Sequence, residues 1–547
     1  MTASRVRGAS ALLATALLGT ALCLLTQQVR AAPTLTPEQA AGRALYEEGE
    51  SAFGDAFSGR LGIARQQVPG MAVRCGNCHG ADGQGRPEGG IRPVNITWSE
   101  LTKAYGHEHD TGRRHGPFDE AALKRAITEG VDPAGNQLDG AMPRFTISGR
   151  DFKALVAYLK QLEFQQDPGV AGATLRLGTL LPATGRFGEL GQAVKAILQA
   201  QLDEINRAGG IYGRRLELVT AEYASEDRDA ARSQLRKLVE QDNVFALLSP
   251  FAAGIEDELD RLANQAKIPV IGPLSLFGDG PRAINQQVFH LMSGVGELAE
   301  VLALHVGRDL KLKAMPALLL HPDGAGGAAL ADALEARLRG QGWSKLDRIA
   351  FRPAAFDAAG TAKALRARGA ETVFLLGPGA DVGALALQMV QQAGQQAGQQ
   401  GAKLPHLPFL LVPGPLAPRA VLDLPAAFEG RILLAYPTVP ADQKPEALRH
   451  YAALFKGSTL IRNHQTSQVP AYSSAVLLAE ALKQAGRDLT RAKLVSALET
   501  FQGFEPGLVP AVSFNAKRRL GALGGYVVAI DLKDKNFRQL GGFVSLP

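Results

Sequence analysis

The pattern of apolar and polar residues divides the chain into three parts. An apolar run covers residues 9–25, directly after Arg5 and Arg7. Helical patterns separated by polar stretches then continue to about residue 165. From residue 174 onward, short apolar runs alternate with amphipathic segments, a pattern that is typical of α/β folds. We therefore predict a short N-terminal segment, a helical domain and a larger α/β part.

The N-terminal segment has the layout of an export signal. The two arginines and the apolar run are followed by polar residues and by Val29-Arg30-Ala31, which ends on a small residue. We predict a signal peptide over 1–31, cleavage after Ala31 and a periplasmic mature protein. The alternative is an uncleaved anchor, but a run of about 17 apolar residues is marginal for a span, which favours cleavage. No other segment has enough consecutive apolar residues, so no stable membrane span is expected after cleavage.

Helices are predicted at three places between residues 36 and 165. Thr36-Pro37-Glu38-Gln39 is a capping box with proline at the first helical position, so a helix is expected from there to about Glu48. A second helix is expected over 119–129, and a third after Ser148. The third has one apolar stripe, formed by Phe152, Leu155, Val156, Leu159 and Leu162. These patterns predict an all-α domain over 36–165.

The alternation after residue 174 predicts parallel, doubly wound sheets. A first series has strands at 175–181, 216–221, 245–248 and 270–271, with helices at 190–207, 227–241 and 255–266. After a gap, a second series has strands at 317–320 and 372–376, with helices at 328–339 and 381–392. The gap indicates two lobes. We therefore predict a linker over 166–173 and a two-lobed α/β domain over 174–547.

Composition narrows the possible partners. The 547 residues include 59 Lys and Arg against 53 Asp and Glu, a net charge of +6. The excess is small and the cations form no stripe, so no nucleic-acid binding is expected. The three cysteines are too few for a disulfide scaffold, and Cys23 lies in the predicted signal peptide.

The other two cysteines form the motif Cys75-Gly76-Asn77-Cys78-His79. This spacing suits two thioether bonds to haem and an imidazole on the iron. A thioredoxin-like motif would need a βαβ pattern around it, and the sequence shows none there. Structural zinc would need a second pair of ligands, for which only loop histidines are available. Because haem is attached outside the cytoplasm, export favours one covalent haem c, held by Cys75 and Cys78 with His79 as axial ligand.

A second axial ligand is expected downstream. Met142 lies in a loop just before the third predicted helix and is followed by Pro143. Because of this loop position and the following proline, we predict that Met142 is this ligand. A thioether would raise the haem potential relative to a second histidine. The alternative ligands are His107, His109 and His115. If they are not ligands, these histidines are expected to belong to a solvated loop.

These residues resemble the class I monohaem cytochrome c family over about 36–165. Tyr46 and the stretch 155–159 are similar to that family's two packed terminal helices. The long segment 51–74, between the first helix and the haem motif, departs from the family pattern and is expected to cover a haem edge.

The rest of the chain resembles type I periplasmic solute-binding proteins, and within them the branched-chain amino acid group. The resemblance rests on residues 180–185, 204–213 and 267–273. It implies two lobes that close on a small solute. It also implies three crossovers between the lobes, near 290–296, 434–440 and 510–516.

The predicted cleft departs from that group where the ligand is held. In the family, one turn carries two serines; this chain has Ala252 and Ala253 there. A Ser/Ala-Thr pair of the family is replaced by Ser275 and Leu276. The family's aromatic residue two positions after Asp323 is an alanine in this chain. A site that lacks such donors loses a charged ligand strongly. We therefore predict that the cleft binds α-amino acids poorly. Its candidate residues are Thr184, Phe187, Phe251, Ala252, Ala253, Ser275, Leu276 and Asp323. The alternative is a cleft that has become an interaction surface.

No catalytic constellation is found in the sequence, so no enzyme activity is expected. The predicted function is that of an exported electron carrier with a solute-binding module. The expected partners are a dehydrogenase or another cytochrome, and a small solute. One alternative is the receptor of an ABC permease with an accessory haem domain. Another is a ligand-responsive redox sensor.

Overall fold

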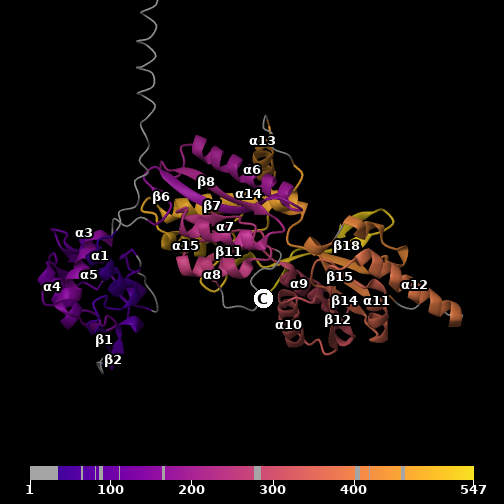
Figure 1. Cartoon of the computed structure of the whole chain (residues 1–547), viewed down its shortest axis with the longest axis horizontal. Coiled ribbons are helices and arrows are strands. Elements are labelled where there is room, and N and C mark those ends of the chain that lie inside the picture. The colour runs from indigo at the N-terminus through magenta and orange to yellow at the C-terminus, as the bar shows by residue number, and fades with distance from the viewer. Residues whose placement is uncertain are drawn as a thin grey trace, which may run out of the picture. The chain divides into compact units, whose positions relative to one another are not determined.

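The structure is a computed structural model, and the chain forms two compact units, residues 1–166 and 167–547. It describes residues 35–62, 66–80, 82–85, 90–109, 111–162, 167–275, 285–400, 407–417, 419–456 and 462–546 (Figure 1). The predicted signal peptide and the cleft candidate Leu276 lie outside these ranges. In the ranges described, no helix combines the length and the apolar character needed to cross a bilayer.

The first unit is built around short helices, as expected. They are α1 (Pro37–Arg43), the π-helical turn η1 (Ala44–Glu48), α2 (Cys75–His79), α3 (Trp98–Leu101), α4 (Glu120–Glu129) and α5 (Gly149–Leu162). The capping box at Thr36 is confirmed: its hydroxyl accepts from the Gln39 amide, and the Gln39 side chain accepts from the Thr36 amide. Gly49, in the left-handed conformation at φ +72°, ends the first helix.

The two ends of this unit pack together through α1, η1 and α5. Gly42 of α1 meets α5 so closely that a Cβ there would lie 2.0 Å from the Ala154 carbonyl oxygen. One turn later the rings of Tyr46 and Tyr158 lie 5.4 Å apart between centroids. The Tyr46 hydroxyl donates to the Gly80 carbonyl at 2.7 Å. The crossing of the terminal helices is therefore tied directly to the residue that follows the haem motif.

Small sheets add to the helical core, so the all-α expectation needs correction. Segment 51–74 contains the η2 turn (Gly70–Ala72) and a hairpin of β1 (Ser58–Leu61) and β2 (Gln66–Pro69), and β1 also pairs with β5 (Arg144–Thr146). The stacked rings of Phe57 and Phe145, 5.2 Å apart, hold this sheet to the core. A second hairpin consists of β3 (His107–Glu108) and β4 (Arg114–His115). These strands are too short for a period of two to stand out in the sequence.

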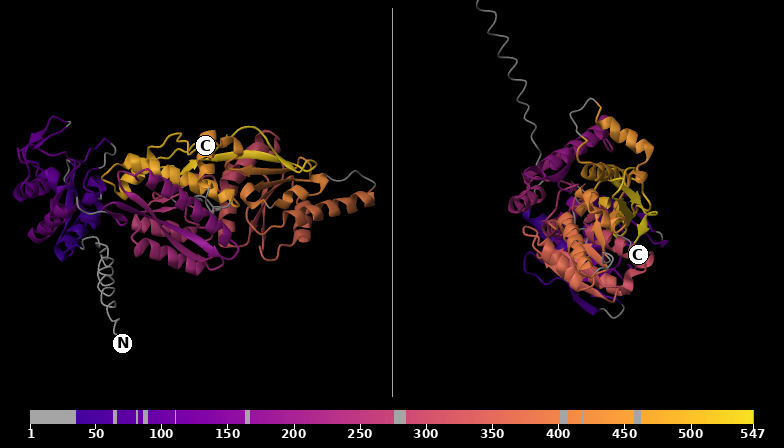
Figure 2. Two further views of the ribbon diagram at one scale, coloured as in Figure 1. Left: turned by 90° about the horizontal axis from the view of Figure 1, so that it is seen from above. Right: turned by 90° about the vertical axis from the view of Figure 1, so that its right-hand side faces the viewer.

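The second unit has two lobes, each built on one sheet (Figures 1 and 2). The first sheet runs β17-β11-β10-β9-β7-β6, with β8 paired to β7, and its pairs are parallel except for β6. Its strands are β6 (Val170–Ala171), β7 (Thr174–Thr184), β8 (Arg215–Ala224), β9 (Ala246–Leu248), β10 (Val270–Ile271), β11 (Val288–Met292) and β17 (Leu520–Ala522).

The second sheet runs β13-β12-β14-β15-β16-β18-β19, with β20 paired to β18. Its first five strands are parallel, and β18 joins β16 antiparallel. Its strands are β12 (Ala317–Pro322), β13 (Leu346–Phe351), β14 (Thr372–Leu375), β15 (Phe409–Pro413), β16 (Ile432–Tyr436), β18 (Gly524–Asp531), β19 (Asn536–Gln539) and β20 (Val544–Ser545). The predicted doubly wound α/β pattern is therefore confirmed.

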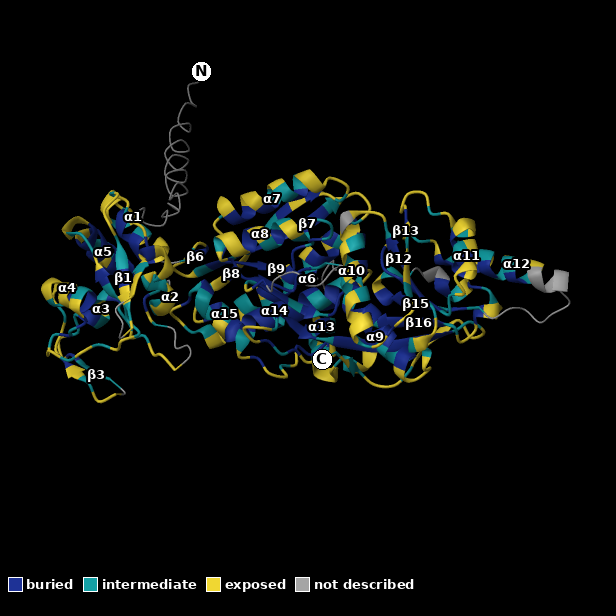
Figure 3. Cartoon of the chain, turned by 90° about the horizontal axis from the view of Figure 1, so that it is seen from below, coloured by how far each residue is buried: buried dark blue, intermediate teal, exposed yellow. Residues whose placement is uncertain are grey.

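Helices cover both faces of each sheet. In the first lobe they are α6 (Gly188–Arg207), α7 (Arg228–Glu240), α8 (Glu256–Ala266), α13 (Pro445–Leu454), α14 (Gln465–Ala485) and α15 (Arg491–Glu499). In the second they are α9 (Val295–Arg308), α10 (Ala325–Gly340), α11 (Ala358–Ala367) and α12 (Val382–Gln400). Separate cores lie against α6 and α14, against α7 and α8, against α9 and α10, and against α11 and α12. Figure 3 shows the buried central strands in dark blue and the exposed outer helix faces in yellow.

The chain passes between the lobes after β11, after β16 and between β17 and β18. The third passage lies at Leu523, so the expectation of 510–516 is corrected. Val512 and Phe514 are buried in the first lobe's core, and β17 still pairs with β11 of that lobe. The first and third passages are bonded to each other, because the Ser293 hydroxyl donates to the Ala522 carbonyl and accepts from the Gly524 amide.

Candidate functional site

The haem motif lies on the one-turn helix α2. Cys75 and Cys78 are three residues apart, a spacing that places side chains on the same side of a helix. Cys78 is exposed, whereas Cys75 is partly buried against the core of the first unit, and both are free thiols. Burial raises the pKa of Cys75 to about 12, so its thiol is protonated at neutral pH.

The imidazole of His79 is oriented by the backbone. Its Nδ1 lies 2.9 Å from the carbonyl oxygen of Val94. A carbonyl only accepts, so Nδ1 carries the proton and the Nε2 lone pair is available for a metal. Burial lowers the pKa of His79, which keeps the ring neutral. This hydrogen bond is the outer contact that metal-bound histidines usually make.

Met142 lies in the loop before β5 and packs on the same core cluster as Cys75. The loop is turned by its own backbone, since the Met142 amide donates to the Asp139 carbonyl at 3.1 Å. The guanidinium of Arg144 donates to the carbonyls of Leu138, Asp139 and Met142, at 2.8, 3.3 and 2.5 Å respectively. The segment that presents the Met142 thioether is therefore fixed at several points.

The residues around the motif fit a haem. The donor set has two thiols, a neutral imidazole with a fixed tautomer and a thioether, which matches known c-type ligation. Apolar side chains are exposed close to the motif: Val94, whose carbonyl faces His79, is 38% exposed, and Met71, four residues before Cys75, is 52% exposed. These are the surfaces that a flat apolar group would bury. Gly85 allows the chain to pass close to Pro93, where a Cβ would come within 2.1 Å of the carbonyl oxygen.

The loop histidines form a cluster of their own. The rings of His107, His109 and His115 have centroids 5.0–5.9 Å apart. The Nε2 atoms of His109 and His115 lie 2.9 Å apart, and Arg113 reaches both His109 and the buried carboxylate of Asp132. His107 Nε2 lies 2.6 Å from the Glu100 carbonyl oxygen. Among the described residues, no group of three or more His, Cys, Asp or Glu side chains is placed to hold a metal ion.

This cluster makes the first unit sensitive to acid. Burial, and then the nearby Arg113, lower the pKa of His109; burial also lowers that of His115, again with Arg113 adding repulsion. Both histidines therefore take up protons more readily in the unfolded chain. The free energy of unfolding therefore has its full value above their ordinary pKa of about 6.5 and decreases as the pH falls below it. Each histidine contributes at most one proton to the difference in proton binding that sets this slope.

We expect the unfolding temperature of the first unit to fall between about pH 6.5 and pH 5, and the substitution His109→Gln to reduce this slope. Melting curves followed through haem absorbance at several pH values would measure it. An equal slope in both proteins would contradict the assignment.

In the second unit, the predicted cleft residues follow the carboxyl ends of parallel strands, the usual ligand edge of such sheets. Thr184 ends β7, Phe251 and Ala253 follow β9, and Ser275 follows β10. Phe187, just before α6, lies 5.5 Å from Phe251 between ring centroids. Across the crossovers, Asp323 follows β12 of the second lobe, where Arg352 Nε lies 3.8 Å from its carboxylate.

Ala252 differs from the other predicted cleft residues in its burial. Its side chain belongs to a buried core cluster of the first lobe together with Ile255 and Leu259, and its amide donates to the Leu274 carbonyl at 3.0 Å.

Sequence reasoning missed Glu256, the first residue of α8. One oxygen of its carboxylate accepts from the Gly254 amide at 2.8 Å, and the other from the Ser275 hydroxyl at 2.9 Å. An acidic residue in the first turn of a helix is the signal that was available for it.

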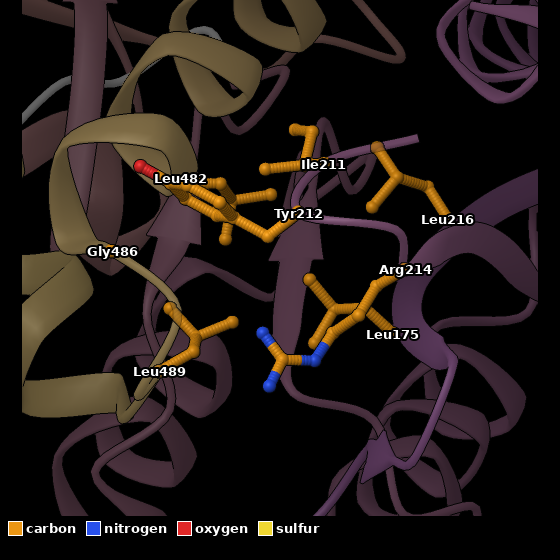
Figure 4. Close-up of a pocket in the computed structure, with 8 residues that line it drawn as sticks. All are labelled: Leu175, Ile211, Tyr212, Arg214, Leu216, Leu482, Gly486 and Leu489. Atoms are coloured by element: carbon orange, nitrogen blue, oxygen red, sulfur yellow. The ribbon is translucent and has the colours of Figure 1, made fainter. Parts of the chain in front are cut away.

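Two crevices of the first lobe lie away from these residues. One has a volume of about 10 Å³, with Arg214 pointing between leucines (Figure 4). It holds no more than one water. The other, of about 300 Å³, lies between α13 and the start of α14 and includes Arg449 and Arg462. Neither is lined by a predicted cleft residue.

Family models match both parts of the chain. The periplasmic binding protein model matches residues 174–536, and the cytochrome c model matches residues 65–163. Among curated relatives, Leu/Ile/Val-binding protein homolog 3 of Brucella melitensis is 27% identical over 45% of this chain. The Leu/Ile/Val-binding protein BraC3 of Rhizobium johnstonii is 26% identical over 44% of it. The chain spans 65% and 64% of the lengths of these relatives.

Solved structures show the same fold. A fatty acid ABC transporter substrate-binding protein from Thermomonospora curvata has a TM-score of 0.53 and 19% identity, covering 70% of this chain and 95% of that one. A branched-chain amino acid ABC transporter protein from Thermus thermophilus with bound valine has a TM-score of 0.52 and 17% identity, covering 68% and 96%. The chain therefore belongs to the periplasmic binding protein family and also carries a cytochrome c domain, which implies covalent binding of haem c.

Proposed function

We propose that the protein is an exported c-type cytochrome with one haem for single-electron transfer, joined to a module that captures a small solute other than an amino acid or docks a redox partner. The observation that carries the electron-transfer part is the bond from His79 Nδ1 to the Val94 carbonyl, because it leaves Nε2 free for a metal beside two free thiols. The periplasm is the proposed location.

Four side chains would hold the haem. Cys75 and Cys78 would attach it covalently, and His79 and Met142 would ligate the iron. A haem bound in this way supplies a reversible one-electron couple. The chain contributes the fixed imidazole tautomer, the turned methionine loop and the apolar side chains around the motif.

The solute module is proposed to disfavour carboxylates. The names of the similar proteins refer to leucine, isoleucine, valine or fatty acids, all of which carry a carboxylate. Here the amides of Phe251 and Ala252 donate within the lobe. The Gly254 amide and the Ser275 hydroxyl both donate to Glu256, so an internal carboxylate uses these donors. In the described chain Glu256 has no ion pair, and its charge would also repel an anionic ligand.

This arrangement gives a test of the solute module. We expect the substitution Glu256→Ala to increase affinity for L-valine about tenfold, since it releases two donors and removes one negative charge. Calorimetric titration of the full chain would measure it. Glu222→Gln, which removes an exposed carboxylate paired with Lys195, is the control. Equal valine affinity in all three proteins would contradict the role given to Glu256.

A second candidate function is that of an ABC-transporter receptor with an accessory haem domain, favoured by the family match over 174–536. Native mass spectrometry of the exported protein tests the common part, because it reports haem number and any bound solute together. One covalent haem is expected, and a mass without haem would overturn the proposal. Reduction by a partner dehydrogenase, as opposed to binding to a permease, would separate the two candidates.

A further inference from the structure

Arg144 lies where three structural elements meet. It is the first residue of β5, which pairs with β1 of the inserted hairpin. Its guanidinium lies against Gly130, the left-handed residue that ends α4: a Cβ at Gly130 would be 1.7 Å from Arg144 Nε. The Leu138 amide in turn donates to the Gly130 carbonyl at 2.8 Å. The guanidinium therefore lies between the end of a helix and the methionine loop.

Within the described residues, this guanidinium donates its hydrogen bonds to the loop. One terminal nitrogen donates to the carbonyls of Met142 and Asp139, and the other to that of Leu138. In the part of the chain that is described, no carboxylate forms an ion pair with Arg144. A planar fork of donors reaching three converging carbonyls fixes both the position and the orientation of a loop, which a single point charge does less well.

We propose that Arg144 is a positioning residue for the axial ligand: it clamps the loop 138–142 so that the Met142 sulfur is held toward the haem iron. The proposal rests on the proposed function, since it requires Met142 to be that ligand. Arg144 does not contact the iron. It acts through the Met142 carbonyl and the turn around it.

Loss of the clamp would weaken methionine ligation without removing the ligand. The loop would sample conformations with the sulfur away from the iron, so an added ligand would compete more easily. We expect the substitution Arg144→Gln to increase the apparent affinity for imidazole about tenfold and to lower the midpoint potential. The methionine-to-iron charge-transfer band is expected to weaken but to remain visible.

Two further variants separate the clamp from a simple charge effect. Arg144→Lys keeps the positive charge and loses the planar fork, so it is expected to resemble Arg144→Gln in imidazole affinity. Arg43→Gln removes an exposed cation that faces Glu47 in the first helix and should leave the affinity unchanged. Thermal melting of each full-length, haem-loaded protein shows which variants are folded. If Arg144→Gln does not fold, Arg144→Lys still tests the positioning role.

The outcomes separate this inference from the proposed function. Unchanged imidazole affinity and potential in both Arg144 variants would overturn the positioning role. So would a wild-type level of imidazole affinity in Arg144→Lys alone, because it would show that charge suffices. If Met142→Ala leaves the spectrum of the wild-type protein unchanged, methionine ligation itself is wrong, and the inference fails together with that part of the proposed function.

Discussion

Replacement of Met142 by alanine is expected to abolish the methionine-to-iron charge-transfer band and to lower the midpoint potential, while the haem stays attached to Cys75 and Cys78. A thioether ligand favours the reduced iron, and axial ligands spread haem potentials over roughly 0.8 V. The expected shift is therefore a substantial part of that range. Visible spectroscopy and a redox titration of the exported protein would measure both changes.

Met315→Ala is the matched control, because Met315 is an exposed methionine of the second unit and has no proposed role at the haem. An unchanged spectrum in Met142→Ala would assign the ligand to a loop histidine. The structure argues against that outcome. His109 and His115 face each other through their Nε2 atoms, and His107 Nε2 faces the Glu100 carbonyl. These nitrogens already have partners, within the hairpin for His109 and His115 and on α3 for His107.

The substitution Gly42→Ala is expected to destabilise the first unit by about 3 kcal/mol, at the upper end of the usual effect of overpacking. The added Cβ would lie 2.0 Å from the Ala154 carbonyl oxygen and 2.7 Å from the Tyr158 Cβ. Backbone atoms cannot rotate away, so α1 and α5 would have to separate. That movement would also disturb the Tyr46 hydroxyl, which bonds to Gly80 beside the haem motif.

Chemical denaturation followed by haem absorbance would measure this loss. Gly149→Ala in α5 is the control, since no atom lies within 4 Å of the added Cβ and alanine favours a helix. A Gly42→Ala protein as stable as the wild type would show that the two helices can adjust at little cost.

Local sequence signals predicted the features that depend on neighbouring residues. The capping box at Thr36 and the end of the helix expected over 119–129 depend on bonds within five residues, and both are present. The alternation of strands and helices also predicted the α/β layers, because each apolar run is buried as a unit. In contrast, β5 pairs with β1 across more than eighty residues, and no local pattern records such a pairing.

The candidate site shows the same division. The spacing of Cys75, Cys78 and His79 is a property of the sequence itself. The contacts of Arg144 and Glu256 depend on where other segments lie in space, so their residue types carried little information alone. The third passage between the lobes was misplaced for a similar reason: residues 510–516 look like a connection, but β17 extends the first sheet further.

The three passages between the lobes also determine which parts of this protein can be exchanged by recombination of its gene. Each lobe of the second unit is assembled from separate stretches of chain, so no single cut within it yields an intact lobe. The boundary between residues 166 and 167 is different, because each compact unit on either side of it is one continuous stretch. One recombination event is enough to add or remove the haem domain there, whereas exchanging one lobe would require several.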